Sequence, residues 1–493
     1  MKIAFISNGY ESLGIEYLSY VLKKNGYDVS LFIDPCLFKE DGFWNINTLS
    51  NIFDYKKVLL KKLKEYAPDV VCFSVFSDNY KWAKSLSKLI KDEIDGVKII
   101  FGGIHPTLMP ESVIRSEHVD CVVMGEAEET ISNAIENIFS NKNNIMHGIL
   151  IKKDGKIKGT IFPRITKDID SYYPDKTIFY SKYPFYSSSY LIAASRGCPF
   201  ECSYCCNDYY HKYYSNDKYV RTRRIENIIY EIELAKNIYN FRYVHFTDDV
   251  INFNRQWLAE LLKKYKEKIN LPYSCYVYPD LVDEDTVRAM KESGCVKVQL
   301  GVQTYSEEKR KIILKRHSSN KKIADALKLF KKYKIFVVAD HIVGDFNNSK
   351  EDLYQLINFY IENTIPDLNE VFFLRYYPQS SLLKYAAKNN LISDDEVKAI
   401  NDGEMSGGLI NTKSRSLIKQ SQSIIMISLL SKQIIKYLYE KNLFLRIPVI
   451  NNILFRIITR LLKPLPYDFY TSQFIKRYIF FIKKIFRFYI KIN

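Results

Sequence analysis

Three cysteines stand close together near the middle of the 493-residue chain, in the segment SRGCPFECSYCC. Cys198, Cys202 and Cys205 have the spacing Cys-x3-Cys-x2-Cys, so one short loop presents three thiols. Three thiolates can each bind one iron of a four-iron four-sulfur cluster and leave the fourth iron open to an exogenous ligand. A structural zinc site would need a fourth ligand, which Cys206 or His211 could supply. The residues alone therefore leave both metal sites open.

The cysteine loop follows an apolar, strand-like run, and similar runs recur after it. From residue 190 to about residue 390, some six strand-then-helix units follow one another. Strands that alternate with helices predict a parallel sheet, and six such units predict a partial (β/α)6 barrel. In such barrels the chemistry takes place at the carboxyl ends of the strands. The cysteine loop is therefore expected at the catalytic end of the first barrel strand.

Residues 190–390 resemble the radical S-adenosylmethionine superfamily, on the three-cysteine motif and on the strand-end sequences FTDDVINF, VQLGVQTYS and LKRH. The resemblance implies a four-iron four-sulfur cluster on the three cysteines, whose open iron binds the amino and carboxylate groups of S-adenosylmethionine. Reductive cleavage of that cofactor gives a 5′-deoxyadenosyl radical, so an electron donor such as flavodoxin or ferredoxin is an expected partner. The residues implied as contacts of S-adenosylmethionine are Phe200, Thr247, Asp248, Asp249, Gln303 and Arg316.

Several of these positions also have a simpler interpretation. Asp248 and Asp249 could cap the next helix, and Arg316 could be a solvated cation at a helix end. Gln303 stands where relatives usually carry glutamate, although its amide can still hydrogen-bond hydroxyl groups. Tyr278, at the end of the third strand, either faces the substrate or packs, since strands favour aromatic residues.

Residues 1–140 also alternate short apolar runs with helical patterns, which predicts a parallel, doubly wound (Rossmann-like) sheet. Ligands of such sheets bind beyond the carboxyl ends of the strands. The unusual sequences SNGYESLG, SVFSDN, GGIHPT and GEAEE occur at those ends. The alternative is that their glycines are simply turn residues.

These segments, with LGIEYLSYVLKKNGY and DCVVMGEAEET, resemble the cobalamin-binding domain that precedes the radical domain in one large subgroup. The resemblance implies a corrin laid against the carboxyl edge of the sheet, with the nucleotide tail beside the GG loop. The implied cobalamin contacts are Gly9, Glu11, Gly14, Ser74, Phe76, Gly102, Gly103, His105, Thr107, Gly125 and Glu126.

One departure from the methionine-synthase type of cobalamin domain concerns the cobalt ligand. That type carries Asp-x-His-x-x-Gly, whose histidine ligates cobalt, and Gly9 and Glu11 stand here where the Asp and His would be. We therefore expect cobalamin with its lower base displaced and no protein histidine on cobalt. The alternative is a flavodoxin-like domain that has lost its ligand.

We predict four segments along the chain. They are a cobalamin-binding-like domain (1–145), a connector (146–188), a radical barrel (189–390) and a mainly helical C-terminal region with a basic amphipathic tail (391–493). The net charge of +16 is concentrated near the end, because residues 411–493 hold 16 Lys and Arg against two acidic residues. This distribution argues against a general nucleic-acid-binding surface.

The cations of the tail recur at helical spacing among phenylalanine and isoleucine, at Lys476, Lys483, Lys484, Arg487 and Lys491. A basic face beside an aromatic-aliphatic one suits an anionic membrane surface. We therefore expect peripheral membrane contact through residues 440–493. The alternative is a C-terminal helix docked on the barrel with its lysines solvated.

The remaining sequence features indicate a cytoplasmic protein. The N-terminus MKIAFISNGY lacks the features of a signal peptide, and 18 consecutive apolar residues occur nowhere. Nine cysteines, three of them tightly spaced, suit a reducing compartment with a metal site. We expect a cytoplasmic location, at the inner face of the membrane if the tail binds there.

The function implied by the resemblance is cobalamin-dependent methylation of an unactivated carbon after radical hydrogen abstraction. The expected substrate is a lipid, a prenyl compound or another secondary metabolite. One alternative is a cobalamin-dependent radical cyclase or ring-rearranging enzyme. An alternative of another class is a catalytically inactive, metal-stapled binding module associated with the membrane. No catalytic residue beyond the cofactor contacts is predicted.

Overall fold

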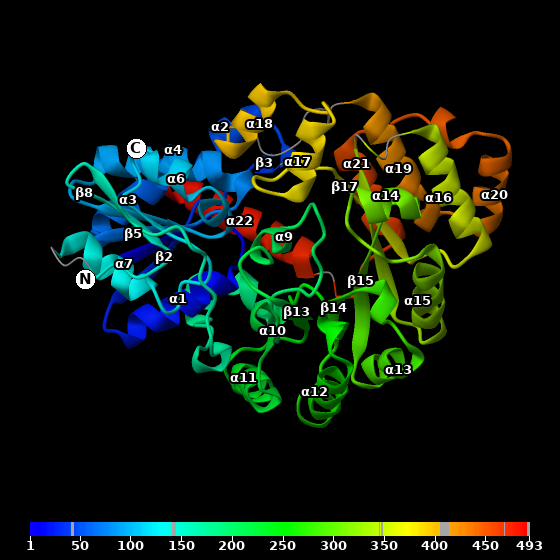
Figure 1. Ribbon diagram of the computed structural model, residues 1–493, viewed down its shortest axis with the longest axis horizontal. Helices are drawn as coiled ribbons and strands as arrows, with labels where there is room; N and C mark the ends of the chain where they lie inside the picture. The colour runs from blue at the N-terminus through cyan, green and yellow to red at the C-terminus, as the bar shows by residue number, and fades with distance from the viewer. Residues whose placement is uncertain are drawn as a thin grey trace.

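The computed structural model contains two large, mainly parallel sheets, one in each half of the molecule, with helices packed around them (Figure 1). The structure describes residues 1–40, 44–140, 144–344, 346, 349–404, 414–467 and 469–490.

The first sheet has seven strands in the order β2-β1-β5-β6-β7-β8-β9. Their bounds are β1 Lys2–Ser7, β2 Asp28–Ile33, β5 Val70–Ser74, β6 Lys98–Gly102, β7 Cys121–Val123, β8 Ile149–Lys153 and β9 Lys156–Gly159. Strands β2, β1, β5, β6 and β7 pair in parallel, and β8 and β9 extend the β7 edge in antiparallel fashion. The parallel strands are buried along nearly their whole length, as expected when helices cover both faces. The strand order reverses between β1 and β5, which is where doubly wound sheets bind their ligands.

The helices of this first half follow the strands in alternation. They are α1 Leu13–Lys24, α3 Lys56–Tyr66, α4 Tyr80–Glu93, α5 Ile104–Leu108, α6 Pro110–Arg115 and α7 Ile131–Phe139. β8 and β9 come from the segment that the sequence assigns to the connector, so that segment contributes to the first sheet.

The second sheet has six parallel strands in the order β10-β13-β14-β15-β16-β17. Their bounds are β10 Tyr190–Ile192, β13 Val244–Phe246, β14 Tyr273–Val277, β15 Cys295–Gln303, β16 Phe336–Val343 and β17 Leu368–Phe373. The helices between them include α11 Ile225–Ile238, α12 Arg255–Lys268, α13 Glu284–Glu292, α15 Asn320–Lys332 and α16 Lys350–Glu362. The predicted order, a doubly wound domain and then a partial (β/α)6 barrel, is confirmed.

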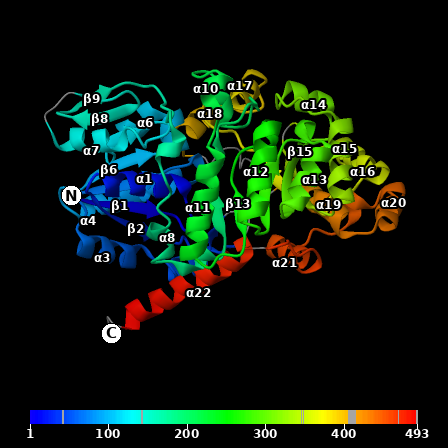
Figure 2. The same cartoon turned by 90° about the horizontal axis from the view of Figure 1, so that it is seen from below.

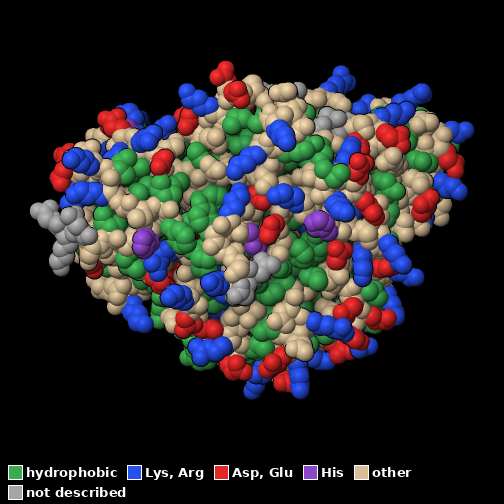
Figure 3. Space-filling view, in the orientation of Figure 1, with side chains coloured by type: hydrophobic (Ala, Val, Ile, Leu, Met, Phe, Trp, Pro, Cys, Tyr) green, Lys and Arg blue, Asp and Glu red, His purple; other side chains and the backbone are tan. Residues whose placement is uncertain are grey.

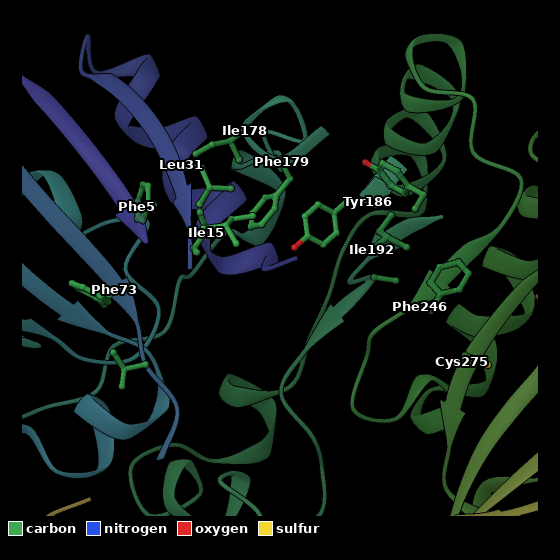
Figure 4. Close-up of a cluster of buried hydrophobic side chains, with 14 of the residues drawn as sticks. Phe5, Ile15, Leu31, Phe73, Ile178, Phe179, Tyr186, Ile192, Phe246 and Cys275 are labelled. Carbon is green, nitrogen blue, oxygen red and sulfur yellow. The ribbon is translucent and has the colours of Figure 1, made fainter. Parts of the chain in front are cut away.

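A single apolar core joins the two halves through the segment between the sheets. Helix α8 (Thr177–Tyr180) directs Phe179 toward Ile15 and Leu31 of the first half, and Tyr186 lies between them and Phe246 of the barrel (Figure 4). Because this core is continuous, it fixes the position of the carboxyl edge of one sheet relative to that of the other.

The C-terminal region is helical, and its last helix returns to the first half. Helix α19 (Arg415–Leu429) packs on β17, and α20 (Lys432–Glu440), α21 (Asn452–Leu462) and α22 (Phe469–Ile490) follow. Figure 2 shows α21 and α22 along one side of the molecule. The phenol oxygen of Tyr478 on α22 accepts a hydrogen bond of 3.0 Å from the backbone N–H of Phe38. Helix α22 therefore docks mainly on the first half and the connector.

The structure corrects one detail of the predicted basic face of the tail. Lys484 lies over the ring of Phe480, 4.1 Å from its centroid, and burial lowers the pKa of its ammonium to about 8. It therefore faces the docked side of α22, unlike the exposed Lys476, Lys483 and Arg487. Lys491 lies outside the described residues.

Candidate active site

The cysteine loop begins directly after the first barrel strand. β11 (Ser195–Arg196) pairs with β12 (Arg221–Thr222), and helix α9 (Asn207–Tyr210) ends the loop. Gly197 has a φ of +82°, and a Cβ at this position would meet the carbonyl oxygen of Tyr219. Only glycine fits here without strain, so it sets the turn that leads into the cysteines.

The three thiols are largely shielded from water. Cys198 and Cys202 are each 7% exposed, and Cys205 is half-buried. Burial raises the pKa of the Cys198 and Cys202 thiols, whereas a hydrogen bond with Cys206 lowers the pKa of Cys205. A bound metal cation deprotonates the thiols that coordinate it, which compensates for burial. The three cysteines therefore fit a bound iron cluster.

One of the two candidate fourth ligands of a zinc site, His211, is engaged within the protein. The Nε2 atom of His211 lies 2.8 Å from the carbonyl oxygen of Cys198 and is thus occupied as a donor. In a cubane cluster, by contrast, each thiolate binds a different iron.

An aromatic and cationic stack lies beside the cysteines. The ring of Phe200 stacks on that of Tyr278, with centroids 3.6 Å apart and an interplanar angle of 10°. The guanidinium of Arg316 lies over the same tyrosine ring, and its Nη1 is 3.9 Å from Sγ of Cys202. Its Nη2 donates to the carbonyl oxygen of Gly301 at 2.9 Å. Arg316 is buried, so its interpretation as a solvated cation is wrong.

The aspartate pair after β13 holds the loop instead of capping a helix. Asp248 accepts hydrogen bonds from the backbone N–H of Ala194, at 3.1 Å, and from the hydroxyl of Ser195. Burial raises the pKa of Asp248 to about 6. The cap of the next helix, α12, is the side chain of Asn254. The capping interpretation of the pair is therefore wrong.

The other two predicted contacts in this region extend the same network. Asp249 accepts a 3.1 Å hydrogen bond from Asn207, whose side chain also donates to Sγ of Cys205 at 3.3 Å. The hydroxyl of Thr247 donates to the carbonyl oxygen of Ile192 at 3.1 Å. These bonds join the ends of β10 and β13 to the cysteine loop.

Gln303 adopts a strained backbone conformation at the end of β15. Its φ is +66°, and the strand pairing shifts register between Gly301 and Gln303. Its side chain is buried close to Gly301, beside Arg316. Positive φ at a residue with a side chain is unusual and concentrates at functional sites. This conformation brings Gln303 to the same strand end as Arg316.

Polar side chains line the face of the barrel sheet that turns away from its helices. Along β15, Lys297 and Gln299 alternate with buried apolar residues, and alternate side chains of a strand point to opposite faces. On β16, Asp340 points to the same face as Gln299. Gln299 Nε2 donates to both carboxylate oxygens of Asp340 at 2.9 Å, and Glu370 is the neighbour of Asp340 on β17. On β13 and β14, Nδ1 of His245 lies 2.6 Å from Oγ of Ser274.

Sequence reasoning did not single out this inner wall. Burial, reinforced by Glu370, raises the pKa of Asp340 well above its usual value. Buried ionisable groups facing a barrel interior are candidates for substrate contact. The signal available in the sequence is a charged residue inside an otherwise apolar strand, as in VVADHIV and LNEVFF.

The carboxyl end of β1 is already occupied by protein groups. The carbonyl oxygen of Gly9 accepts hydrogen bonds of 2.7 Å from Tyr186 Oη and from Arg477 Nη1 of α22. The carboxylate of Glu11 pairs with Lys176 at 2.9 Å, and Glu16 pairs with the same lysine at 2.8 Å. Burial raises the pKa of Glu16 well above its usual value. The structure thus places Glu11 in a buried ion-pair cluster between the two halves.

The glycines of the first sheet approach neighbouring backbone. A Cβ at Gly103, where φ is +99°, would lie 2.7 Å from the backbone nitrogen of Val75. A Cβ at Gly125 would meet the backbone of Arg164, whereas Gly102 has room for one. Thr107 Oγ1 accepts from the Gly125 N–H at 2.8 Å and donates to the carbonyl oxygen of Gly103 at 2.7 Å. Close packing of loops is therefore sufficient to require glycine at positions 103 and 125.

The remaining predicted cobalamin contacts lie around the reversal in strand order. His105 is fully buried, with Nδ1 3.1 Å from Ser77 Oγ and its ring 4.2 Å from that of Tyr80. Its Nε2 has no hydrogen-bond partner in the protein, and burial lowers the pKa of the imidazole to about 4. Three further predicted positions are Gly14, Ser74 and Phe76. A Cβ at Gly14 would meet only the side chain of Ser12. Ser74 is the last residue of β5, and Phe76 is exposed.

The carboxyl edge of the first sheet is bonded directly to the cysteine region. Tyr209 Oη of α9 donates to the carbonyl oxygen of Thr107 at 3.2 Å. Glu126 forms ion pairs with Arg196, at 3.1 Å, and with Arg221, at 2.6 Å. Burial opposes the charge on Glu126, but both arginines outweigh it and lower the pKa of the carboxyl. Glu126 therefore joins the two halves.

A further ion pair joins the first sheet to the last barrel strand. Arg375, just beyond β17, lies 2.7 Å from the carboxylate of Asp78, which follows β5. Contacts from both the first and the last barrel strands thus meet the carboxyl edge of the first sheet, and the catalytic ends of the two sheets lie against each other.

Two family models match the chain in this same order. The B12 binding domain matches residues 4–135, and the Radical SAM superfamily matches residues 192–360.

Curated relatives are similar over most of their length. An uncharacterized methyltransferase of Pyrococcus horikoshii is 25% identical over 388 residues, covering 77% of this chain and 79% of that protein. The anaerobic magnesium-protoporphyrin IX monomethyl ester cyclase of Cereibacter sphaeroides is 24% identical over 458 residues, covering 85% and 71%. The cytidylyl-2-hydroxyethylphosphonate methyltransferase of Streptomyces wedmorensis is 23% identical, covering 67% and 68%.

Two solved structures share the fold. The cobalamin-dependent S-adenosylmethionine radical enzyme OxsB, with aqua-cobalamin and S-adenosylmethionine bound, covers 99% of this chain and 80% of its own, with a TM-score of 0.64 and 13% identity. The radical S-adenosylmethionine methyltransferase TsrM from Kitasatospora setae covers 79% of this chain and 76% of its own, with a TM-score of 0.62 and 14% identity. At these identities the likeness concerns the fold.

Proposed function

The chain belongs to the radical S-adenosylmethionine enzymes that carry a cobalamin-binding domain, and from this premise we propose that it methylates an unactivated carbon of a lipid, prenyl compound or other secondary metabolite. The cofactors of this family are a four-iron four-sulfur cluster, S-adenosylmethionine and cobalamin. When bound, they supply hydrogen abstraction from carbon and a transferable methyl group.

One observation carries the proposal: the cysteine loop and the carboxyl edge of the first sheet are in direct contact, through Tyr209 and Thr107. A methyl group carried at one edge can reach a substrate at the other only if the two edges face each other at short range. Four groups fix this arrangement, since Glu126 pairs with Arg196 and Asp78 pairs with Arg375.

The residues of the chain have separable roles in this proposal. Cys198, Cys202 and Cys205 hold the cluster. Arg316 offers a charge beside Cys202 that suits the carboxylate of S-adenosylmethionine. The ring of Tyr278, between Arg316 and Phe200, holds that guanidinium in place. Asp248 fixes the backbone of the loop at Ala194 and Ser195.

The polar inner wall supports a substrate that enters the barrel with a hydrogen-bonding end. Gln299, Asp340 and Glu370 present an amide and two carboxyl groups on three adjacent strands. A purely apolar substrate would offer these groups no hydrogen bond, whereas a polar end could extend the existing bonds between Gln299 and Asp340. A lipid or prenyl substrate would therefore place its polar end against this wall.

Cyclisation is the second candidate, favoured by the likeness to the magnesium-protoporphyrin IX monomethyl ester cyclase over 85% of this chain. The two reactions differ in their products. Methyl transfer adds one methyl group to the substrate, whereas ring closure adds none.

The test is anaerobic turnover of the reconstituted enzyme with S-adenosylmethionine, methylcobalamin, a reductant and panels of candidate substrates. We expect 5′-deoxyadenosine together with a product heavier by one methyl group. A product that keeps all its carbons and gains a ring would replace methylation by cyclisation. The variant in which the three cluster cysteines are alanine is the matched control, and absence of 5′-deoxyadenosine from the wild type would favour an inactive binding module.

A further inference from the structure

Helix α21 exposes an apolar face. Leu454, Ile457, Leu461 and Leu462 have the spacing i, i+3, i+7, i+8, which gathers them on one side of a helix. Leu461 is 77% exposed and Leu462 is 61% exposed. An adjacent side of the helix is docked, because Phe455 and Thr459 are buried there.

Helix α22 repeats this arrangement over a greater length. Ile475, Ile479, Phe486 and Ile490 are all exposed and fall on one side of the helix, at i, i+4, i+11 and i+15. On the opposite side, Tyr478, Phe481 and Ile485 are buried against the first half of the molecule and the connector.

These faces differ from those of an ordinary docked helix. A surface helix of a globular protein turns its apolar stripe to the core and its polar residues to water. Helices α21 and α22 also turn apolar residues to the core, but they expose further apolar residues to water. Exposed apolar side chains in contiguous patches mark a surface that binds something.

The two helices lie on the same side of the molecule. They run along its lower edge in Figure 2, and in the view of Figure 1 they lie behind the barrel and the first sheet. The two helices therefore lie on the side of the protein away from the face shown in Figure 3, which carries hydrophobic, basic and acidic side chains together.

The charge of the side chains on this side of the protein indicates what kind of surface it binds. Lys476, Lys483 and Arg487 are exposed and flank the apolar stripe of α22. The segment from residue 411 onward holds 16 Lys and Arg against two acidic residues. A long apolar stripe flanked by cations matches the interface of an anionic bilayer, where the stripe enters the acyl boundary and the cations meet lipid phosphates. Within the described residues, none of the helices combines the length and apolarity needed to cross a bilayer.

We propose that α21 and α22 form a membrane-binding face that lies in the plane of an anionic phospholipid bilayer. On its inner side α21 contacts the barrel, because Arg460 Nη2 lies 2.9 Å from the carboxylate of Glu370 on β17. The bilayer-facing helix is therefore bonded to the polar inner wall, which places that wall one helix away from the lipid surface.

The experiment is co-sedimentation of the full-length reconstituted protein with vesicles of phosphatidylglycerol and phosphatidylcholine, and with vesicles of phosphatidylcholine alone. We expect binding to the anionic vesicles that weakens, but persists, as salt is raised. The variant Lys476→Gln/Lys483→Gln/Arg487→Gln should bind them roughly 100-fold more weakly at low salt. The variant Leu461→Ser/Ile479→Ser/Phe486→Ser should lose the vesicle binding that persists at high salt.

The matched control is Leu234→Ser/Ile238→Ser on α11, because these residues are also exposed and apolar but lie on a helix with three glutamates and one lysine. This control should bind as the wild type does. Iron content and S-adenosylmethionine cleavage without vesicles should stay normal in all three variants, since every substitution is on an outer helix face. The proposal is overturned if the wild type ignores anionic vesicles, if the tail variants bind as well as it does, or if the α11 control loses as much binding.

Discussion

The guanidinium carbon of Arg316 lies 4.2 Å from the centroid of the Tyr278 ring, in a stack that also includes Phe200. These two residues come from the end of β14 and the segment after α14 (Glu307–Ile312), yet they meet beside Cys202. Burial opposes the charge on Arg316, but Tyr204, Cys202 and Tyr278 outweigh it and raise the pKa of the guanidinium. A permanent cation is thus held next to the cluster cysteines.

We expect Arg316→Lys to weaken the binding of S-adenosylmethionine roughly 2- to 30-fold, because a lysine keeps the charge but loses the planar stack, worth about 0.5–2 kcal/mol. The measurement is the KM for S-adenosylmethionine in reductive cleavage, at equal iron content. Tyr278→Phe keeps the ring and should stay close to the wild type. An unchanged KM in Arg316→Lys would remove Arg316 from the cofactor site.

We expect the reconstituted protein to bind about four iron and four sulfide per chain. Replacing Cys198, Cys202 and Cys205 together by alanine should abolish the absorbance of the cluster. Cys206→Ala should retain it, because Cys206 interacts with Cys205 but stands outside the three-cysteine motif. One zinc and no iron per chain would contradict the cluster.

The part of the site that the sequence predicts best depends on short-range spacing. The three cysteines are neighbours along the chain, so their chemistry is visible before folding, and the strand-helix alternation places their loop at the end of β10. The position of Arg316 depends on a turn and on packing against Tyr278, so no local pattern separates a buried cation from a solvated one.

Contacts between residues that are far apart in the sequence were not predicted either, because no local pattern indicates them. Glu11 and Lys176 are separated by 165 residues, and Gly9 and Arg477 by 468. Periodicity describes which face of an element is buried but not which element covers it. Hence Glu11 could be placed at the end of β1, whereas its lysine partner could not.

We expect Gly103→Ala to reduce stability by about 1–3 kcal/mol, because an alanine there would combine a positive φ with a contact to the Val75 backbone. Gly102→Ala is the matched control, since a Cβ at that position has room. Unfolding midpoints and the amount of cobalamin retained per chain would be compared. Equal effects of the two substitutions would show that the approach to Val75 is unimportant.

We expect Lys176→Met to destabilise the protein by about 3–5 kcal/mol, because it leaves Glu11 and Glu16 buried without their cation. The double variant Lys176→Met/Glu16→Gln should recover part of this loss by removing one of the two carboxylates. Thermal unfolding of the single and double variants measures the effect. A double variant less stable than Lys176→Met would indicate that the cluster acts through packing and not through charge.

We expect His105 to make stability sensitive to mild acid. Burial lowers the pKa of its imidazole in the folded chain to about 4, so between that value and the ordinary 6.5 only the unfolded chain takes up the proton. The neutral imidazole therefore contributes fully above pH 6.5, and the contribution, at most about 3 kcal/mol, is lost as the pH falls toward 4. His105→Gln should shrink the difference in unfolding midpoint between about pH 7.5 and about pH 5. His147→Gln is the matched control, because that side chain is exposed, and it should leave the difference as in the wild type. If His105→Gln keeps the full difference, another buried group is responsible for the loss of stability in acid.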